Sequence, residues 1–274
     1  MAGTMSLTNL LLLNFSVVSG LMVATWLISL AIKNVSIVDI GWGLGFVVIA
    51  WTTFATTCEE GPSRWLLPVM TTLWGVRLSG HLAVRNLGKG EDKRYAEMRS
   101  RRGPRFAFTS LVIVFGLQGV VMWLVALPLQ IGIHGAESNW EWAHGLGLLL
   151  WSTGFFFEAV GDAQLARFLS DPDSAGRVLN RGLWRYTRHP NYFGDCLVWW
   201  GLWLTSVAHG PGLWTVVSPL VMTFCLVRFS GVRLLERSLV QTRSGYEDYV
   251  RETNAFFPWF PRTSTAADHS TKAD

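Results

Sequence analysis

The sequence has few charged residues for its length. Asp, Glu, Lys and Arg make up 15% of its 274 residues, whereas soluble domains contain about 25%. Half of the residues are hydrophobic, and 15 of them are tryptophan. This composition excludes an intrinsically disordered chain and argues against a soluble domain. It is the composition of a polytopic membrane protein.

Cysteines are too few and too far apart to form a stabilising framework. They are Cys58, Cys196 and Cys225, with no CxxC pair and no cluster of histidines. A disulfide-rich fold is therefore excluded, and no metal site is predicted. The sequence also lacks a GxGxxG turn after a strand and a Walker loop, so a Rossmann or P-loop nucleotide site is excluded.

Long apolar runs follow one another along most of the chain. Most reach the ~20 residues that a helix needs to cross ~30 Å of hydrocarbon. We predict an all-α fold with seven transmembrane helices in a single domain over residues 1–262, followed by a disordered polar tail at residues 263–274. The seven predicted spans are residues 7–32, 37–57, 65–84, 107–131, 142–162, 192–208 and 211–232.

The loops between these spans alternate in charge. The loops after the third and fifth spans and the C-terminal tail are rich in arginine, whereas the loops on the opposite side hold Arg64 as their single basic residue. Because Lys and Arg collect in cytoplasmic loops, we predict that the N-terminus lies outside and the C-terminus in the cytoplasm. Basic residues interleaved with spans also explain the net charge of +4 without a nucleic-acid partner.

Two charged residues are predicted within the spans, where an ionisable group is costly and marks a candidate site. Asp39 opens the second span, and Arg77 lies in the third, shortly after Trp74. Each also has a structural interpretation. Asp39 can cap its helix, and the long side chain of Arg77 can reach the cytoplasmic surface.

Acidic residues recur at the cytoplasmic end of the fifth span and after the seventh. Glu158 and Asp162 are four residues apart and share one helix face. Like charges at this spacing repel unless a ligand or the loop arginines lie between them. Glu236, with Arg233 and Arg237 beside it at the end of the seventh span, is consistent with an ordinary solvated helix end.

The densest group of polar and aromatic residues spans residues 182–195, at the entry to the sixth span. The orientation of the protein in the membrane requires only Lys and Arg in such a loop. This stretch also contains histidine, asparagine, two tyrosines and a carboxylate. Arginines pair with phosphates, and the rings can stack on a base or a nicotinamide. The stretch therefore indicates a site for a large ligand with phosphates, an amide and flat rings. Its candidate contacts are Tyr186, Arg188, His189, Asn191, Tyr192 and Asp195.

Short motifs spread over most of the chain carry a family resemblance. They are VDIGWG at 38–43, LWGVR at 73–77, RYAEMR at 94–99, GLWRYTRHPNYFGD at 182–195, GYEDY at 245–249 and FPWFP at 257–261. In these motifs the chain resembles the steroid 5-alpha-reductase family, and most closely its bacterial branch, the DUF1295 proteins of unknown function. The resemblance implies a seven-helix membrane reductase that holds NADPH between its C-terminal helices, within residues 107–262, and reduces an activated C=C bond.

The resemblance also assigns residues to the cofactor. Arg77, Asp162, Arg177, Asn191, Tyr192 and Asp195 fall on cofactor-site positions of the family, and Glu158 falls where the family has a polar contact of another type. The full predicted NADPH site is Arg77, Glu158, Asp162, Arg177, Tyr186, Arg188, His189, Asn191, Tyr192, Asp195 and Arg233.

Asp39 and Trp74 are the predicted catalytic residues, because they fall where family steroid reductases carry a glutamate and a tyrosine that polarise the substrate carbonyl. Hydride addition to the β-carbon of an enone develops charge on the oxygen, and an acid or strong donor beside that oxygen lowers the barrier. A carboxyl at Asp39 can stay protonated in an apolar site. The indole N–H of Trp74 can donate a hydrogen bond but cannot transfer its proton as a tyrosine could. Because both residues depart from the family pattern, steroid, polyprenyl and acyl enones all remain open as substrates.

Two other function classes remain open. Membrane methyltransferases of the isoprenylcysteine and phospholipid type resemble the C-terminal half and bind S-adenosylmethionine, but they carry paired glutamates where this chain has Glu236 alone. A transporter or a non-catalytic scaffold is the third class, although transporters tend to show repeat symmetry and this sequence does not. We expect a monomeric reductase of the bacterial inner membrane, embedded in the bilayer and acting on a lipid-soluble small molecule.

Overall fold

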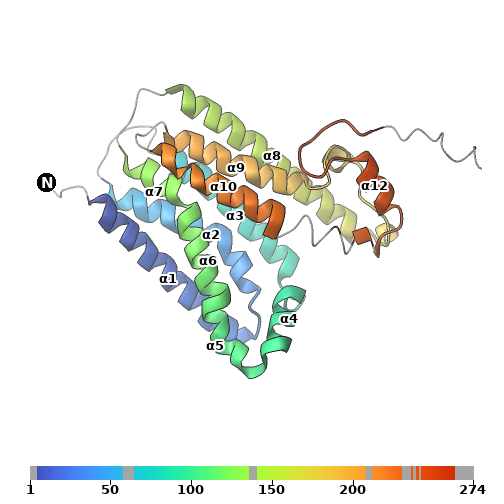
Figure 1. Cartoon of the computed structure of the whole chain (residues 1–274), viewed down its shortest axis with the longest axis horizontal. Helices are drawn as coiled ribbons and strands as arrows, with labels where there is room; N and C mark the ends of the chain where they lie inside the picture. Colours follow the sequence, from blue (N-terminus) through green and yellow to red (C-terminus); the bar gives the residue numbers. More distant parts are fainter. Residues whose placement is uncertain are drawn as a thin grey trace, which may run out of the picture. The chain divides into compact units, whose positions relative to one another are not determined.

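The computed structural model describes residues 5–57, 65–135, 141–207, 212–229, 236, 239–240 and 242–262. All regular structure in this part of the chain is helical, as the composition predicts, and the predicted tail at residues 263–274 lies outside it. The α-helices labelled in Figure 1 are α1 (Leu7–Ile32), α2 (Ile37–Thr56), α3 (Leu66–Asn86), α4 (Lys93–Arg102), α5 (Phe106–Ser110), α6 (Leu117–Val125), α7 (Leu127–His134), α8 (Glu141–Ser170), α9 (Pro190–Val207), α10 (Val217–Phe224) and α12 (Tyr246–Glu252).

Three helical segments of the described chain are long and apolar enough to cross a membrane. They are Leu7–Ile32, Ile37–Thr56 and the continuous segment Lys93–Val125. The first two agree with the predicted helices to within one residue. The third begins well before the predicted residue 107, because the charged helix α4 runs directly into it. These segments indicate a membrane protein.

The fourth predicted span, residues 107–131, is not one regular helix. Residues 111–116 form a π-helical stretch, and the helix breaks at Ala126, where ψ is 0°. Pro128 stands in the first turn of the next helix, α7. Proline has no backbone N–H and clashes with the preceding turn, so a single helix does not continue through this point.

The fifth predicted span continues beyond its apolar run. Helix α8 runs to Ser170, whereas the prediction ends at residue 162. The added turns contain polar residues such as Gln164 and Arg167 among apolar ones, and both of these residue types are good helix formers. The helix ends where Asp171 precedes Pro172, because a residue before proline disfavours the helical conformation.

The described chain divides into two compact units. Unit 1 comprises Met1–Trp151 and Trp199–Val221, and unit 2 comprises Ser152–Val198 and Met222–Asp274. Within unit 1, α2 packs against α1, α3 and α7, and α1 packs against α6 (Figure 1). The single domain over residues 1–262 stays a prediction.

Glycines allow α2 and α3 to approach closely in unit 1. A Cβ atom on Gly43 would lie 2.4 Å from the carbonyl oxygen of Gly75, and a Cβ atom on Gly75 would lie 2.5 Å from that of Gly43. Small residues at helix contacts are the usual means by which membrane helices bring their backbones together. The packing of α2 on α3 therefore depends on having no side chain at either position.

We expect Gly43→Ala to destabilise the protein, since the added methyl group must push α3 away. Overpacking of this kind typically costs about 1–3 kcal/mol. Gly41→Ala, on the same helix, is the matched control, because a Cβ atom there meets nothing within 4 Å. It should leave stability unchanged or raise it by up to ~1 kcal/mol through helix propensity. Thermal unfolding in detergent distinguishes the two, and equal melting temperatures for both variants would contradict the close contact.

Candidate functional site

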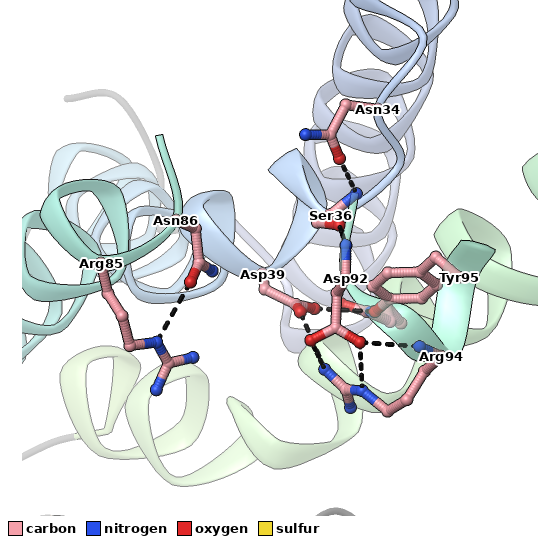
Figure 2. A network of polar contacts seen from close by, with 9 residues as sticks. Asn34, Ser36, Asp39, Arg85, Asn86, Asp92, Arg94 and Tyr95 are labelled. Atoms are coloured by element: carbon pink, nitrogen blue, oxygen red, sulfur yellow. Dashed lines mark hydrogen bonds and ion pairs between the residues drawn. The ribbon is translucent and has the colours of Figure 1, made fainter. Parts of the chain in front are cut away.

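Asp39, in the first turn of α2, lies within a polar cluster contributed by three helices. The Tyr95 hydroxyl of α4 donates to Asp39 Oδ1 at 2.8 Å, and Arg94 Nη2 lies 3.2 Å from Oδ2 (Figure 2). Gln118 Nε2 of α6 donates to the Tyr95 hydroxyl at 3.0 Å and lies 3.5 Å from Asp39 Oδ1. Tyr95 is buried. The carboxylate therefore faces three donors, and the tyrosine hydroxyl both donates and accepts.

The turn between α1 and α2 holds α4 beside this carboxylate. Ser36 Oγ accepts a hydrogen bond from Asp92 N at 2.7 Å, and Asn34 Oδ1 accepts one from Ser36 N at 2.9 Å (Figure 2). Glu91 Oε1 accepts from Val35 N at 2.8 Å. Backbone groups on both segments are thus fixed, so the start of α4 is anchored at the start of α2.

These contacts distinguish Asp39 from a simple helix cap. A capping side chain accepts from the backbone N–H groups of its own helix, and the N-cap position of α2 is occupied by Ser36. Asp39 instead accepts from side chains of α4 and α6. Sequence reasoning did not identify Tyr95 or Gln118 as partners, although an amide inside an apolar run is itself a sign of a polar contact.

The other two predicted residues of unit 1 lie on α3. Trp74 is completely buried, and its ring packs against those of Phe46 and Trp199, with ring centroids 5.7 and 5.3 Å away. Arg77 is partly buried one turn further along the helix. Trp74 therefore belongs to an aromatic core cluster, while Arg77 lies in a different unit from the remaining predicted cofactor residues.

Glycines bring α8 and α9 into contact within unit 2. A Cβ atom on Gly194 would lie 2.4 Å from Glu158 N, and one on Gly154 would lie 2.5 Å from the carbonyl oxygen of Gly194. One on Gly161 would lie 3.2 Å from Asn191 N. The contacts advance along α8 while they retreat along α9, so the two helices run antiparallel with their backbones close together.

Predicted cofactor residues lie along this α8–α9 crossing. Asn191 Nδ2 donates to Asp162 Oδ1 at 3.0 Å. Glu158, Asp162 and Asp195 are 3%, 6% and 9% exposed. Because a buried carboxyl group is costly unless it has polar partners, three of them in one helix pair mark this crossing as the candidate ligand site of unit 2.

Arg188 and His189 bind the C-terminal segment of unit 2. Arg188 Nε donates to Glu236 Oε1 at 2.7 Å, and its Nη1 donates to the carbonyl oxygens of Val250 and Thr253. His189 Nε2 lies 3.1 Å from the same Glu236 oxygen. Arg188 thus uses Nε and Nη1 on protein groups, so these contacts hold the segment around α12 against the start of α9.

The remaining predicted contacts are spread around this segment. The Tyr192 ring stacks on His189 with a centroid separation of 5.6 Å, while Tyr186 is exposed and meets the ring of Phe260. Arg177 lines a cavity of about 240 Å³ in unit 2. Arg233 lies outside the described residues. The other residues lining the cavity are Phe168, Asp171, Asp173, Ser174, Val178, Leu179, Asn180 and Arg181.

A family profile described as "Protein of unknown function (DUF1295)" matches residues 25–253. The chain belongs to this family. The match begins within α1 and ends just after α12, so it includes both the Asp39 cluster and the α8–α9 crossing. The DUF1295 part of the prediction is thereby confirmed.

Among curated proteins, the chain is similar to "Uncharacterized protein C594.04c" of Schizosaccharomyces pombe. The two are 26% identical over an alignment 224 residues long, which covers 70% of this chain and 62% of the relative. This DUF1295 chain thus aligns with less than two thirds of the length of that relative. A yeast relative gives no support to a specifically bacterial branch. No solved structure matches the chain.

The ion pair of Glu236 in this DUF1295 chain predicts a dependence of stability on pH. Burial disfavours the charged carboxylate, but hydrogen bonds from His189 and Arg188 outweigh burial and lower the pKa of Glu236 to about 2. The pKa of Glu236 in the folded protein lies below its ordinary value of 4.5. The ion pair therefore contributes its full stabilisation at pH values above 4.5. This contribution is lost as the pH falls towards 2.

We therefore expect Glu236→Gln to melt below the wild type near neutral pH, with the difference shrinking as the pH falls from about 5 to about 2. A series of thermal melts over this range measures the difference. A gap that stays constant with pH would show that the carboxylate charge contributes nothing.

Proposed function

We propose that this DUF1295 protein is a membrane-embedded, NADPH-dependent reductase of the activated C=C bond of a lipid-soluble enone. The observation that carries the proposal is the Tyr95 hydroxyl bonded to the Asp39 carboxylate in unit 1. Such a pair holds one transferable proton in a partly buried site, and reduction of an enone requires a proton donor near the developing enolate.

The reaction adds a hydride to the β-carbon, and the electrons of the C=C bond move onto the carbonyl oxygen. A hydrogen bond to this oxygen stabilises the charge as it develops. We assign that role to the proton shared by Tyr95 and Asp39. Its transfer to the enolate gives an enol that tautomerises to the saturated ketone. Arg94 is half exposed beside Asp39, so water can return the proton to the pair.

The α8–α9 crossing and the segment after α8 contain the groups that we assign to the cofactor. NADPH, when bound, supplies the hydride. The chemistry of the side chains fits it: the buried carboxylates of Asp162 and Glu158 can accept from hydroxyl or amide N–H groups, and Asn191 offers both a donor and an acceptor. Arg177 and Arg181 line the cavity of unit 2, where guanidinium groups suit phosphates.

We also propose the seven-span arrangement with the N-terminus outside and the C-terminus in the cytoplasm. Support comes from the basic residues of the segment around α4 and of the segment between α8 and α9, since such residues favour the cytoplasmic side. Ser100 is exposed on α4. In a background with Cys58, Cys196 and Cys225 replaced by serine, a Ser100→Cys variant should react with a membrane-impermeant maleimide only from the cytoplasmic side. Labelling from outside would contradict the proposed orientation.

The first experiment is a thermal-shift titration of the detergent-purified protein with NADPH, NADH and S-adenosylmethionine in parallel. A ligand that binds the native state raises the melting temperature by mass action. Stabilisation by NADPH supports the reductase and justifies screening enone lipids. Stabilisation by S-adenosylmethionine alone would replace the reductase with a membrane methyltransferase, and no response to any of the three would contradict the proposed function.

A further inference from the structure

The segment between α3 and α5 carries an excess of positive charge. Over residues 85–105 there are eight basic residues and three acidic ones, which leaves a net charge of +5. The basic residues are Arg85, Lys89, Lys93, Arg94, Arg99, Arg101, Arg102 and Arg105.

Each of the three acidic side chains is already engaged by one of these cations. Glu91 pairs with Arg99 at 2.8 Å, and a hydrogen bond from that guanidinium lowers the pKa of Glu91. Asp92 and Glu97 likewise pair with arginines of α4, at 3.0 and 2.5 Å. The other five cations form no salt bridge with a carboxylate among the described residues. These unpaired cations are Arg85, Lys89, Lys93, Arg102 and Arg105.

Exposed apolar side chains border the unpaired cations on both sides in the sequence. Val84 and Leu87, at the end of α3, are 85% and 65% exposed, and Phe108 and Val112, after α4, are 74% and 70% exposed. Large apolar side chains next to basic ones are typical of the membrane interface, where the former enter the acyl chains and the latter remain among the headgroups. The same polypeptide continues into the apolar segment Lys93–Val125.

The segment is also held in place rather than loosely attached. Tyr95 binds Asp39 of α2, and Asp92 and Glu91 bind the turn before α2. The start of α4, the helix that carries Lys93 and Arg102, is thus anchored at the start of α2.

We infer that residues 85–105 form a binding surface for the phosphate headgroups of anionic phospholipids. Arginine binds a phosphate through two parallel hydrogen bonds, and lysine acts as a point charge. Anionic headgroups would neutralise the five unpaired cations, whereas a zwitterionic headgroup carries its own compensating charge. This inference does not depend on the proposed reductase activity.

The test compares the full-length wild type with a variant in which Lys89, Lys93, Arg102 and Arg105 are all replaced by glutamine. The matched control removes four exposed cations of unit 2, with Arg167, Arg185, Arg251 and Arg262 replaced by glutamine. Binding of fluorescent phosphatidylglycerol and phosphatidylcholine to each detergent-solubilised protein is measured by titration, with inorganic phosphate as a competitor. Size-exclusion chromatography and circular dichroism confirm that each variant is folded.

The wild type should bind phosphatidylglycerol at least tenfold more tightly than phosphatidylcholine. A basic residue near an anionic surface contributes about fivefold, which corresponds to ~1 kcal/mol, so the four-residue variant should lose at least tenfold and the control much less. Equal binding of the two lipids, an equal loss in the control, or full displacement by millimolar inorganic phosphate would overturn the inference. If the four-residue variant does not fold, the double variant Lys89→Gln with Lys93→Gln replaces it. Its loss of affinity for phosphatidylglycerol should be proportionally smaller, and the same outcomes would overturn the inference.

Discussion

Replacement of Tyr95 by phenylalanine is expected to lower the turnover of an enone substrate by about 10²–10⁴-fold, the usual contribution of a general acid. The substitution removes only the hydroxyl that donates to Asp39 at 2.8 Å and accepts from Gln118 at 3.0 Å. The ring remains, so the position of α4 should be kept. NADPH consumption with a 3-oxo-Δ4-steroid and with other lipid enones is the appropriate measurement.

A purely structural role for Tyr95 would give a different result. Tyr249→Phe removes a comparable buried hydroxyl, which donates to the carbonyl oxygen of Trp184, and serves as the matched control. Both substitutions should cost about 1 kcal/mol of stability through the lost hydrogen bond. Turnover should fall only for Tyr95→Phe. Loss of stability without loss of turnover in Tyr95→Phe would remove this residue from the mechanism.

Asp39→Asn tests the other member of the Tyr95–Asp39 pair. The amide keeps the size of the side chain but no longer attracts Arg94 as an ion, and it holds no proton that it can exchange with Tyr95. We expect turnover to fall while the affinity for NADPH stays unchanged, since the residues that we assign to the cofactor belong to unit 2 and Asp39 belongs to unit 1. A change in NADPH affinity with normal turnover would contradict the assignment of Asp39 to proton transfer and would indicate a role in cofactor binding.

Asn191→Ala is expected to weaken NADPH binding by about 10- to 100-fold. Hydrogen bonds to charged groups are worth about 1.5–3 kcal/mol, and Asn191 donates to the buried carboxylate of Asp162 at 3.0 Å. Without this donor, the Asp162 carboxylate loses a hydrogen-bond partner and is no longer held in the orientation in which we expect it to accept hydrogen bonds from NADPH. Isothermal titration of the detergent-purified variant with NADPH measures the effect.

Asn14→Ala is the control for Asn191→Ala. Asn14 is also a buried amide, and its Nδ2 donates to Thr53 Oγ1 at 2.9 Å in unit 1. Its removal should lower thermal stability without changing NADPH affinity. If both variants bind NADPH as the wild type does, the α8–α9 crossing is not the cofactor site.

The sequence alone was sufficient for the class of structure and for the residues that line the α8–α9 crossing. Long apolar runs predict helices because a segment within a bilayer must satisfy its backbone hydrogen bonds internally, as a helix does, and α1 and α2 begin where the pattern predicts. Glu158 and Asp162 were identifiable because charged groups are costly within a span, and Asn191 because it lies in the densest polar and aromatic stretch of the sequence. The predicted boundaries differ from the structure where hydropathy does not decide the end of a helix. One such place is Ala126, where the helix breaks before Pro128, and the other is Ser170, the residue to which α8 extends.

Only the tertiary structure decided which side chains meet. Tyr95 and Asp39 are 56 residues apart, and Arg188 and Glu236 are 48 apart. Nothing in the periodicity of either segment specifies these pairs, because periodicity records which face of a helix is buried and not which helix lies against it. The partner is set by the close packing of helices at particular positions, such as Gly43 on α2. The tertiary contacts pair Asp39 with Tyr95 and Arg188 with Glu236.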